Sequence, residues 1–322
     1  MTSPHLSPAI VEHFAVQMDV AGRAALKRAQ AAMSAIYREG GHSRNAVPDA
    51  TTALAYAIAR MPATYAACTR AFDLVAAQAP SFTPRSMLDL GAGPGTATLA
   101  AAAVWPGLET ARLLEPNAAL SSLAAAAIPA ATAMSCTIEG GDLTGRRAAW
   151  PAADLTTLSY VLAEQPLVRI ATIVVPIATL VTGLIVIVEP GTPAGYARIL
   201  AAREALLTAG LHIVAPCPHA DSCPLPSGDW CHFSIRLQRS AGHRHLKDAD
   251  LPFEDERFSF VSAMRDPSAL PATARLIRPA TVEKGFADLA LCTPTGLETR
   301  RVKRRDASAY KAAKSMTWGD AV

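Results

Sequence analysis

The first thirty residues lack the features of a targeting segment. They contain no compact apolar run, and two acidic residues, Glu12 and Asp19, precede the first arginine. A secretory signal needs an apolar core behind a basic start, and a transit peptide is rich in arginine and poor in acidic residues. We therefore expect neither kind of segment, and we expect a cytoplasmic protein.

Charged residues are scarce, at 18% of the chain, and none occurs in residues 170–188, IATIVVPIATLVTGLIVIV. A run of this length is long enough to propose a transmembrane helix. However, Pro176 and Gly183 interrupt it, and its second half is a β-branched run of strand length that ends in the turn-like EPGTP. We therefore expect a buried helix followed by a buried strand, and no membrane-spanning segment.

The chain is long and apolar enough, with 322 residues of which 51% are hydrophobic, to bury one large core. Residues 1–80 are rich in alanine at helical spacing and are broken by prolines, which predicts several short helices. From Ser86 onward, strand-like runs alternate with helical stretches, which is typical of an α/β protein with a parallel, doubly wound sheet. The strand-like runs are SMLDL (86–90), ARLLE (111–115), AMSCTIE (133–139), DLTTLSYVL (154–162), GLIVIVE (183–189), RFSFVSAM (257–264) and FADLALC (286–292).

We expect a seven-stranded sheet with a cysteine-rich insertion between its fifth and sixth strands. The expected regions are an N-terminal helical region (1–80), the cofactor half of the core (81–214), the cysteine-rich insertion (215–250), the remaining core strands with a fourth cysteine (251–296) and a basic C-terminal tail (297–322).

The first strand runs into a glycine loop, MLDLGAGPGT, which lacks the spacing of a dinucleotide fingerprint. Gly91, Gly93 and Gly95 permit a tight turn and let a ligand lie against the backbone. The run is G-x-G-x-G, whereas the dinucleotide motif is G-x-G-x-x-G. Asp89, just before the loop, would repel a pyrophosphate but suits a cationic ligand such as the methionyl ammonium of S-adenosylmethionine. The loop resembles that of class I methyltransferases.

Two further acidic residues follow the next strands. Glu115, after the second strand, is placed to accept hydrogen bonds from both ribose hydroxyls of the cofactor, and Asp142, after the third, is placed to reach the adenine amino group. Each of these carboxylates alone is typical of a solvated loop residue. The set Asp89, Gly91, Gly93, Gly95 and Glu115, in this order and spacing, indicates S-adenosylmethionine binding.

The sequence says less about the residues that would face the methyl acceptor. The fourth strand ends in DLTTLSYVL and lacks both the N-P-P-Y motif of amino-methylating enzymes and the cysteine nucleophile of cytosine C5 enzymes. Asp154, Ser159 and Tyr160 are candidates by position only, and no catalytic residue is assigned.

Four of the six cysteines, Cys217, Cys223, Cys231 and Cys292, have the spacing C-x(5)-C-x(7)-C-x(60)-C. Clustered thiols in a cytoplasmic chain indicate metal ligands or redox groups. The short C-x(2–4)-C knuckles of structural zinc sites are absent, although His219 and His232 lie close enough to serve as zinc ligands. Four thiolates in wide loops suit an iron–sulfur cluster. Spacing alone leaves cluster, zinc and no metal open.

Several segments together resemble the methyltransferase-like family of the small ribosomal subunit, the bacterial relatives of the mitochondrial small-subunit assembly factor. These segments are LDLGAGPGT, LSYVLAE, VEPGTPAGYARI, APCPHADSCPLPSGDWCHFSIRLQRS, LCTPTG and SMTWGD. The resemblance covers the chain from about residue 40 to its end. It implies a class I methyltransferase fold and a four-iron, four-sulfur cluster on Cys217, Cys223, Cys231 and Cys292.

Positive charge is concentrated near the C-terminus. Residues 292–322 hold seven lysines and arginines against three acidic residues, a net of +4, while the whole chain carries +3. Attraction to RNA phosphates explains such a cluster, and a solvated tail is the alternative. The expected RNA-binding residues are Arg300, Arg301, Lys303, Arg304 and Arg305, with Arg236, Arg239, His243, Arg244 and His245 as a possible extension.

These observations predict an S-adenosylmethionine-dependent methyltransferase acting on small-subunit ribosomal RNA. In that case methyl transfer is direct and depends on positioning and desolvation. The alternative is a ribosome-binding assembly factor that does not catalyse, and a redox or iron sensor acting through the cluster is compatible with either.

Overall fold

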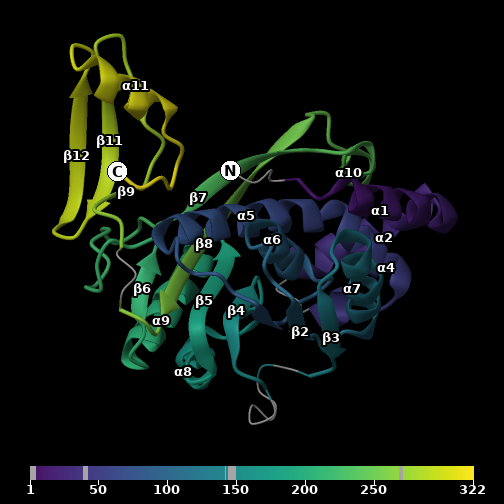
Figure 1. The fold of residues 1–322 in the computed structure, drawn as a ribbon. Coiled ribbons are helices and arrows are strands. Elements are labelled where there is room, and N and C mark those ends of the chain that lie inside the picture. Colours follow the sequence, from purple (N-terminus) through teal and green to yellow (C-terminus); the bar gives the residue numbers. More distant parts are fainter. Residues whose placement is uncertain (1–4, 39–42, 142, 144–149, 268–270) are drawn as a thin grey trace.

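The computed structural model of the chain describes residues 5–38, 43–141, 143, 150–267 and 271–322 (Figure 1). Asp142 therefore lies outside the described residues. The N-terminal region is helical, as expected. It comprises α1 (Pro8–Ala21), α2 (Arg23–Arg38), α3 (Ser43–Ala46), α4 (Ala50–Ala59) and α5 (Met61–Gln78). The Asp49 carboxylate accepts the backbone N–H of Thr52 at 2.8 Å and so caps α4, while Pro62 occupies the first turn of α5, where no N–H is needed.

The main sheet has eight strands within the described residues, in the order β3-β2-β1-β4-β5-β8-β6, with β7 pairing with β8. Its strands are β1 (Ser86–Leu90), β2 (Thr110–Leu114), β3 (Ser135–Glu139), β4 (Ala153–Ser159), β5 (Val181–Pro190), β6 (His212–Ala215), β7 (Phe233–Gln238) and β8 (Phe253–Met264). Strands β1 to β5 are parallel, in the 3-2-1-4-5 order of a Rossmann-like fold. Strand β8 is antiparallel to β5, β6 and β7. The α/β, Rossmann-like part of the expected fold is confirmed, but the sheet is mixed rather than parallel.

Helices cover both faces of this sheet. Helices α6 (Thr96–Val104) and α7 (Ala118–Ala131) pack with the N-terminal helices in one apolar core, and α8 (Ile170–Ala178) and α9 (Pro193–Thr208) belong to a second core. Two 3-10 turns, Leu162–Glu164 and Leu167–Arg169, lead from β4 into α8. The arrangement is therefore doubly wound, as the alternating pattern predicted.

The apolar run at residues 170–188 divides as expected into helix α8 and strand β5. Strand β5 is buried on both faces because it lies between β4 and β8 in the sheet interior. None of the described helices combines the length and the apolar character needed to cross a bilayer.

Two details of the expected topology are wrong. The short strand β6 was not predicted, so the cysteine-rich segment lies between β6 and β8 and not between the fifth and sixth strands. FADLALC forms β11 (Phe286–Thr293) in a separate sheet and not a last strand of the main one. The cysteine-rich segment itself contains β7 and α10 (Ala241–Lys247).

The second, small sheet has the strands β9 (Arg275–Leu276), β10 (Thr281–Val282), β11 and β12 (Gly296–Lys303). Helix α11 (Ala307–Ser315) packs against it, as the yellow part of Figure 1 shows. The expected basic tail is thus folded as a strand and a helix. The last residues return to the main body, where Arg70 of α5 donates to the Asp320 carboxylate at 2.7 Å and to the Thr317 hydroxyl at 3.0 Å.

Candidate cofactor cavity and cysteine site

The glycine loop between β1 and α6 lies at the carboxyl edge of the sheet and lines a cavity of about 540 Å³. Its three glycines have positive φ angles of 75° (Gly91), 55° (Gly93) and 78° (Gly95), which other residues rarely adopt. A Cβ on Gly91 would lie 2.4 Å from Val161 Cγ2, and one on Gly95 would lie 2.8 Å from Ile128 Cδ1. A Cβ on Gly93 would have no described neighbour within 4 Å, so this glycine leaves open space beside the cavity.

Asp89 lies beneath the loop and is buried, outside the cavity lining. Its two carboxylate oxygens accept hydrogen bonds from the hydroxyls of Thr98, at 2.7 Å, and Thr157, at 2.8 Å. Burial raises the pKa of this carboxyl, and the two hydroxyl donors oppose that shift. The structure therefore places Asp89 as a support that fixes α6 and β4 to the end of β1, and its contact with a cofactor stays a prediction.

Glu115 lies at the end of β2 and lines the cavity. Its carboxylate accepts the backbone N–H groups of Gly93, at 2.8 Å, and Asn117, at 2.7 Å. Burial raises the pKa of Glu115, and these two N–H donors oppose the shift. Because a carboxylate offers about four acceptor positions, Glu115 retains capacity for ligand hydroxyls while it holds the glycine loop in place.

Three residues of the cavity lining, all from the N-terminal helical region, were missed by the sequence analysis. Tyr37 of α2, Tyr56 of α4 and Arg60, at the junction of α4 and α5, line the cavity together with Tyr160. Burial raises the pKa of Tyr37 and of Tyr56, so both phenols are neutral near pH 7. No local motif marks these residues, because the packing of the N-terminal helices over the sheet edge is what brings them to the cavity.

The candidate acceptor-side residues of β4 separate into two groups. Asp154 lies at the start of the strand, where it accepts the N–H groups of Arg85 and Ser86, and it is remote from the cavity. Ser159 and Tyr160 lie at the opposite end and do line the cavity. Tyr160 has a φ of 60°, and its hydroxyl donates to Glu256 at 3.0 Å. A left-handed tyrosine costs about 1–3 kcal/mol, and such strain is concentrated at functional sites.

The four predicted cysteines come together although they are spread over 76 residues of sequence, since all of them line one cavity. Cys217 follows β6, Cys223 lies in the next loop, Cys231 precedes β7 and Cys292 comes from β11 of the small sheet. Tyr196 of α9 donates its hydroxyl to Cys223 Sγ at 3.0 Å. The site therefore joins the main sheet and the small sheet.

Two buried arginines, Arg203 and Arg275, also line the cysteine cavity. Arg275 donates to the carbonyl oxygens of Pro216 and Gly319, both at 2.9 Å. Within the described residues, Arg203 Nε and one amino nitrogen of Arg275 have no hydrogen-bond partner. Buried guanidinium groups with unused donors fit a negatively charged group in this cavity.

Burial also raises the pKa of the Cys217, Cys231 and Cys292 thiols, in the last case to about 12, and mutual repulsion between the sulfurs adds to the effect. The thiols are thus neutral unless a cationic centre binds them. Among the described residues, no group of three or more His, Cys, Asp or Glu side chains is arranged to hold a metal ion. His219 Nε2 lies 3.5 Å from Cys292 Sγ, and His232 packs between Trp230 and Trp318.

The predicted RNA-binding residues lie on β12 and the turn after it. Arg300 pairs with Glu298, and Arg301 forms a bidentate pair with Asp288. In the described part of the chain, the exposed Lys303, Arg304 and Arg305 have no ion pair, so their charges face solvent.

The residues of the suggested extension differ in their surroundings, and their contact with RNA stays a prediction. Arg236 pairs with Asp255, Arg239 pairs with Glu254, and His243 is fully buried against the N-terminal helices. Only Arg244 and His245 of the five are exposed without a described ion pair.

The first strand of the sheet opens through a left-handed glycine loop onto a cavity, and this arrangement defines a Rossmann-like α/β protein. The chain belongs to the mitochondrial small ribosomal subunit Rsm22 family, whose model matches residues 50–322. This confirms the resemblance noted in the sequence.

Curated relatives agree with this family. The chain is 28% identical over 295 residues to the human mitochondrial ribosome assembly protein METTL17, and the match covers 83% of this chain and 61% of that one. It is 24% identical over 181 residues to the mitochondrial Rsm22-cox11 tandem protein 2 of Schizosaccharomyces pombe, which covers 43% of this chain and 24% of that one. The chain thus spans about three fifths and one quarter of the length of these relatives. Their names place them in mitochondria, and the cytoplasmic location of this chain stays a prediction.

Solved structures with a similar fold include methyltransferases. One is a precorrin-6y C5,15-methyltransferase of Geobacter metallireducens, with 14% identity, a TM-score of 0.40 and coverage of 61% of this chain and 86% of that one. Another is the magnesium protoporphyrin IX methyltransferase of Synechocystis with bound S-adenosylmethionine, with 13% identity, a TM-score of 0.40 and coverage of 64% and 84%. At these scores the likeness carries no argument about ligand or substrate, which depends on the residues of this chain.

Proposed function

We propose that the chain is an S-adenosylmethionine-dependent methyltransferase that acts on small-subunit ribosomal RNA. The observation that carries the cofactor part is the open space at Gly93, whose N–H is held by Glu115 beside the cavity. Gly91, Gly93 and Glu115, which line the cavity, bind the cofactor together with Gly95 of the same loop, Asp89 supports the loop, and Asp142 is kept as a candidate for the adenine end. When bound, the cofactor supplies a methyl group activated on a sulfonium.

The part of the proposal that concerns RNA rests on family membership and on charge. The human relative is named a ribosome assembly protein, and the family takes its name from the small ribosomal subunit. Lys303, Arg304 and Arg305 offer three solvent-facing charges for a phosphate backbone, and Arg300 and Arg301 extend the row. The cytoplasm is the compartment we propose for this partner.

We also propose that Cys217, Cys223, Cys231 and Cys292 hold a four-iron, four-sulfur cluster, with zinc as the alternative metal. The convergence of four thiols from two sheets on one cavity supports this, as do the unused donors of Arg203 and Arg275. The cluster would join the small sheet to the main body and so fix the basic strand β12 in position. The role is structural, because within the described residues the cysteine cavity and the cofactor cavity share no lining residue.

The second candidate function is an assembly factor that binds the small subunit without catalysis. The naming of the human relative as an assembly protein favours it. In that case the cofactor, if bound, serves as a structural ligand, and the cluster and the basic strand perform the binding.

The deciding experiment is transfer of labelled methyl from S-adenosylmethionine to small ribosomal subunits isolated from cells that lack the gene. The protein is prepared anaerobically, and Gly93→Arg serves as the control. We expect label at one RNA position with the wild type and none with the variant. Absence of label, while cofactor and subunit both bind, would favour the assembly factor.

The RNA surface is tested separately. Replacing Arg304 and Arg305 by glutamate should weaken binding to small-subunit RNA by about tenfold or more and flatten its salt dependence, because each lost phosphate contact reduces counterion release. Fluorescence anisotropy at several salt concentrations measures both effects. The double change Arg23→Glu and Arg28→Glu on α2 is a matched control at another exposed position. Equal effects of the two double changes would show that β12 is an ordinary solvated surface and not an RNA-binding site.

A further inference from the structure

A second cavity, of about 700 Å³, lies next to the cofactor cavity. It is formed by α2, the junction of α4 and α5, helix α10 and the segment that leads into β8. Tyr37 and Arg60 line both cavities, so the two spaces meet at these side chains. A group bound in the second cavity would therefore lie beside whatever occupies the first.

The lining of the second cavity is cationic. Four cations and two carboxylates contribute to it: Lys27, Arg60, Arg239, Lys247, Asp248 and Glu254. Subtracting two negative from four positive charges leaves a surplus of two. Lys27 pairs with Asp248, which removes one charge of each sign and leaves the surplus on the other three cations.

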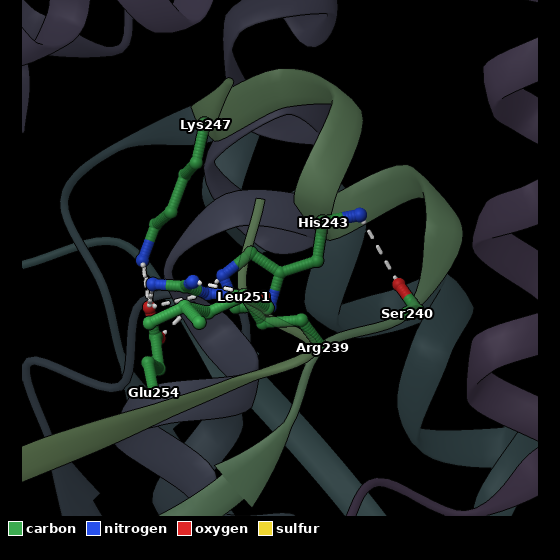
Figure 2. Close-up of polar contacts among 6 residues, drawn as sticks. All are labelled: Arg239, Ser240, His243, Lys247, Leu251 and Glu254. Carbon is green, nitrogen blue, oxygen red and sulfur yellow. Dashed lines mark hydrogen bonds and ion pairs between the residues drawn. The ribbon is translucent and has the colours of Figure 1, made fainter. Parts of the chain in front are cut away.

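Glu254 is shared between two of these cations, as Figure 2 shows. Arg239 donates to its Oε2 at 2.8 Å and Lys247 at 2.9 Å. His243, fully buried, has Nε2 3.5 Å from Glu254 Oε1, but burial lowers its pKa to about 4, so the ring is neutral near pH 7. Glu254 therefore compensates the charge of only one of the two cations, Arg239 and Lys247, and His243 adds no charge.

Arg60 supplies the other surplus charge, at the junction itself. Within the described residues its guanidinium forms no hydrogen bond or ion pair, and the side chain is exposed to the cavities. Two carboxyls act on it through space: Glu254, which Arg239 and Lys247 share, and Glu256, which accepts the Tyr160 hydroxyl at 3.0 Å. Burial raises the pKa of Glu256, and Arg60 opposes that shift. The guanidinium thus presents its donors to a ligand.

We propose that this junction binds the phosphate group of a nucleotide, held by Arg60 with help from Arg239 and Lys247. The surplus of positive charge in the lining attracts a phosphate, and a guanidinium fork binds two phosphate oxygens at once. A base or ribose attached to that phosphate would point past Tyr37 into the cofactor cavity. The identification of the nucleotide as the methyl acceptor rests on the proposed function.

Isothermal titration calorimetry of the full chain tests the site with three probes: cytidine 5′-monophosphate, the dinucleotide cytidylyl-cytidine and cytidine. We expect the two phosphate ligands to bind at least about tenfold more tightly than the nucleoside, since hydrogen bonds from a guanidinium to a phosphate are roughly twice as strong as bonds between neutral groups. Arg60→Gln should remove that preference. Arg244→Gln, an exposed arginine of α10 outside the cavity lining, is the matched control and should leave it unchanged.

Binding of the dinucleotide would identify an RNA chain as the source of the phosphate, and binding of the monophosphate alone would identify a free nucleotide. Equal affinity for cytidine and its monophosphate, or an Arg60→Gln variant that binds as the wild type does, would overturn the proposal. If Arg60→Gln does not fold, Arg60→Lys keeps the charge without the fork and should bind the phosphate ligands several-fold more weakly.

The same samples are titrated with S-adenosylmethionine. Cofactor binding without phosphate binding would refute this site and leave the proposed cofactor function standing. Phosphate binding without cofactor binding would refute the proposed cofactor function and leave the phosphate site standing. The two failures are therefore distinguishable.

Discussion

Single residues decide whether the glycine loop can meet a ligand. Gly91 and Gly95 are needed because their missing side chains would collide with Val161 and Ile128. Gly93 differs, because its missing side chain leaves space beside the cavity. Gly93 is therefore the position at which a new side chain can block a ligand without colliding with neighbouring residues of the protein.

Replacing Gly93 by arginine should abolish S-adenosylmethionine binding, because the new side chain would fill the cavity. The positive φ adds a strain of about 1–2 kcal/mol, which a domain of this size tolerates. Calorimetric titration and a thermal unfolding curve measure the two effects. Gly22→Arg is the matched control, since Gly22 also has a positive φ of 82° and no described neighbour around its Cβ position. Cofactor binding by Gly93→Arg at wild-type affinity would show that the ligand lies elsewhere.

Glu189, at the end of β5, is a second residue with a measurable signature. It is fully buried, its Oε1 accepts the Leu162 N–H at 2.8 Å, and within the described residues Oε2 has no partner. Burial raises its pKa from 4.5 to about 8. Between these two values the folded state holds a proton that the unfolded state has lost, so stability falls as pH rises from about 4.5 to about 8.

Glu189→Gln should remove this pH dependence, because the amide is neutral and can still accept the Leu162 N–H. At about pH 8 the variant should be more stable than the wild type by on the order of 3 kcal/mol, and near pH 5 the two should be similar. Urea unfolding at both pH values measures the difference. Glu204→Gln, an exposed glutamate on α9, serves as the control. Parallel pH profiles for wild type and Glu189→Gln would show that Glu189 is not the group that titrates.

At the scale of elements, the first five strands could be predicted from the sequence because each is a short apolar run bounded by turn residues. Among the later ones, RFSFVSAM is confirmed as β8 of the main sheet, whereas β6 was missed and FADLALC was placed in the wrong sheet. The four residues of β6 are too few to show a pattern, and the apolar alternation of FADLALC predicts a strand without saying which sheet it joins. Pairing partners far apart in sequence are selected by tertiary packing, so β11 was assigned to the wrong sheet.

The docking of the C-terminal segment depends on one side chain of α5. Arg70, with 7% of its side chain exposed, donates to the Thr317 hydroxyl, the Trp318 carbonyl and the Asp320 carboxylate. Arg70→Ala should remove these three hydrogen bonds, while Asp320 still accepts from the Thr317 N–H and hydroxyl, and should destabilise the docked segment by about 2 kcal/mol.

Hydrogen exchange measures this effect at the Gly319 and Val322 amides, which bond to the carbonyls of Leu276 and Ala274. Arg85→Ala removes an arginine whose pair with Glu109 is solvent-exposed, and it should cost less than about 1 kcal/mol. If both substitutions leave the exchange of the C-terminal amides unchanged, Arg70 is not what holds the segment.

At the scale of the whole molecule, the cysteine site connects two sheets. Cys217, Cys223 and Cys231 belong to the segment between β6 and β7 of the main sheet, whereas Cys292 belongs to the small sheet that carries the basic strand. A metal group on all four thiols would therefore act as a cross-link between the two parts, and its binding free energy would contribute to folding.

Cys292→Ser should lower the iron and sulfide content of anaerobically purified protein and reduce its melting temperature by several degrees. Iron analysis, visible absorption and calorimetry measure these changes. Cys136→Ser, a cysteine of β3 outside the cavity, is the control. Colourless wild-type protein that contains zinc in place of iron would rule out the cluster and support the alternative metal.

The sequence by itself determined the helical N-terminal region, the Rossmann-like order of glycine loop and acidic residue, and the choice of four cysteines. These features are local, because turn geometry, hydrophobic period and residue chemistry act over a few neighbouring positions. Only the tertiary structure decided that Asp89 faces two threonines rather than a cavity, and that Arg60 stands where two cavities meet. Such placements depend on how distant helices pack against the sheet, and that packing is the sum of many weak contacts that no short segment encodes.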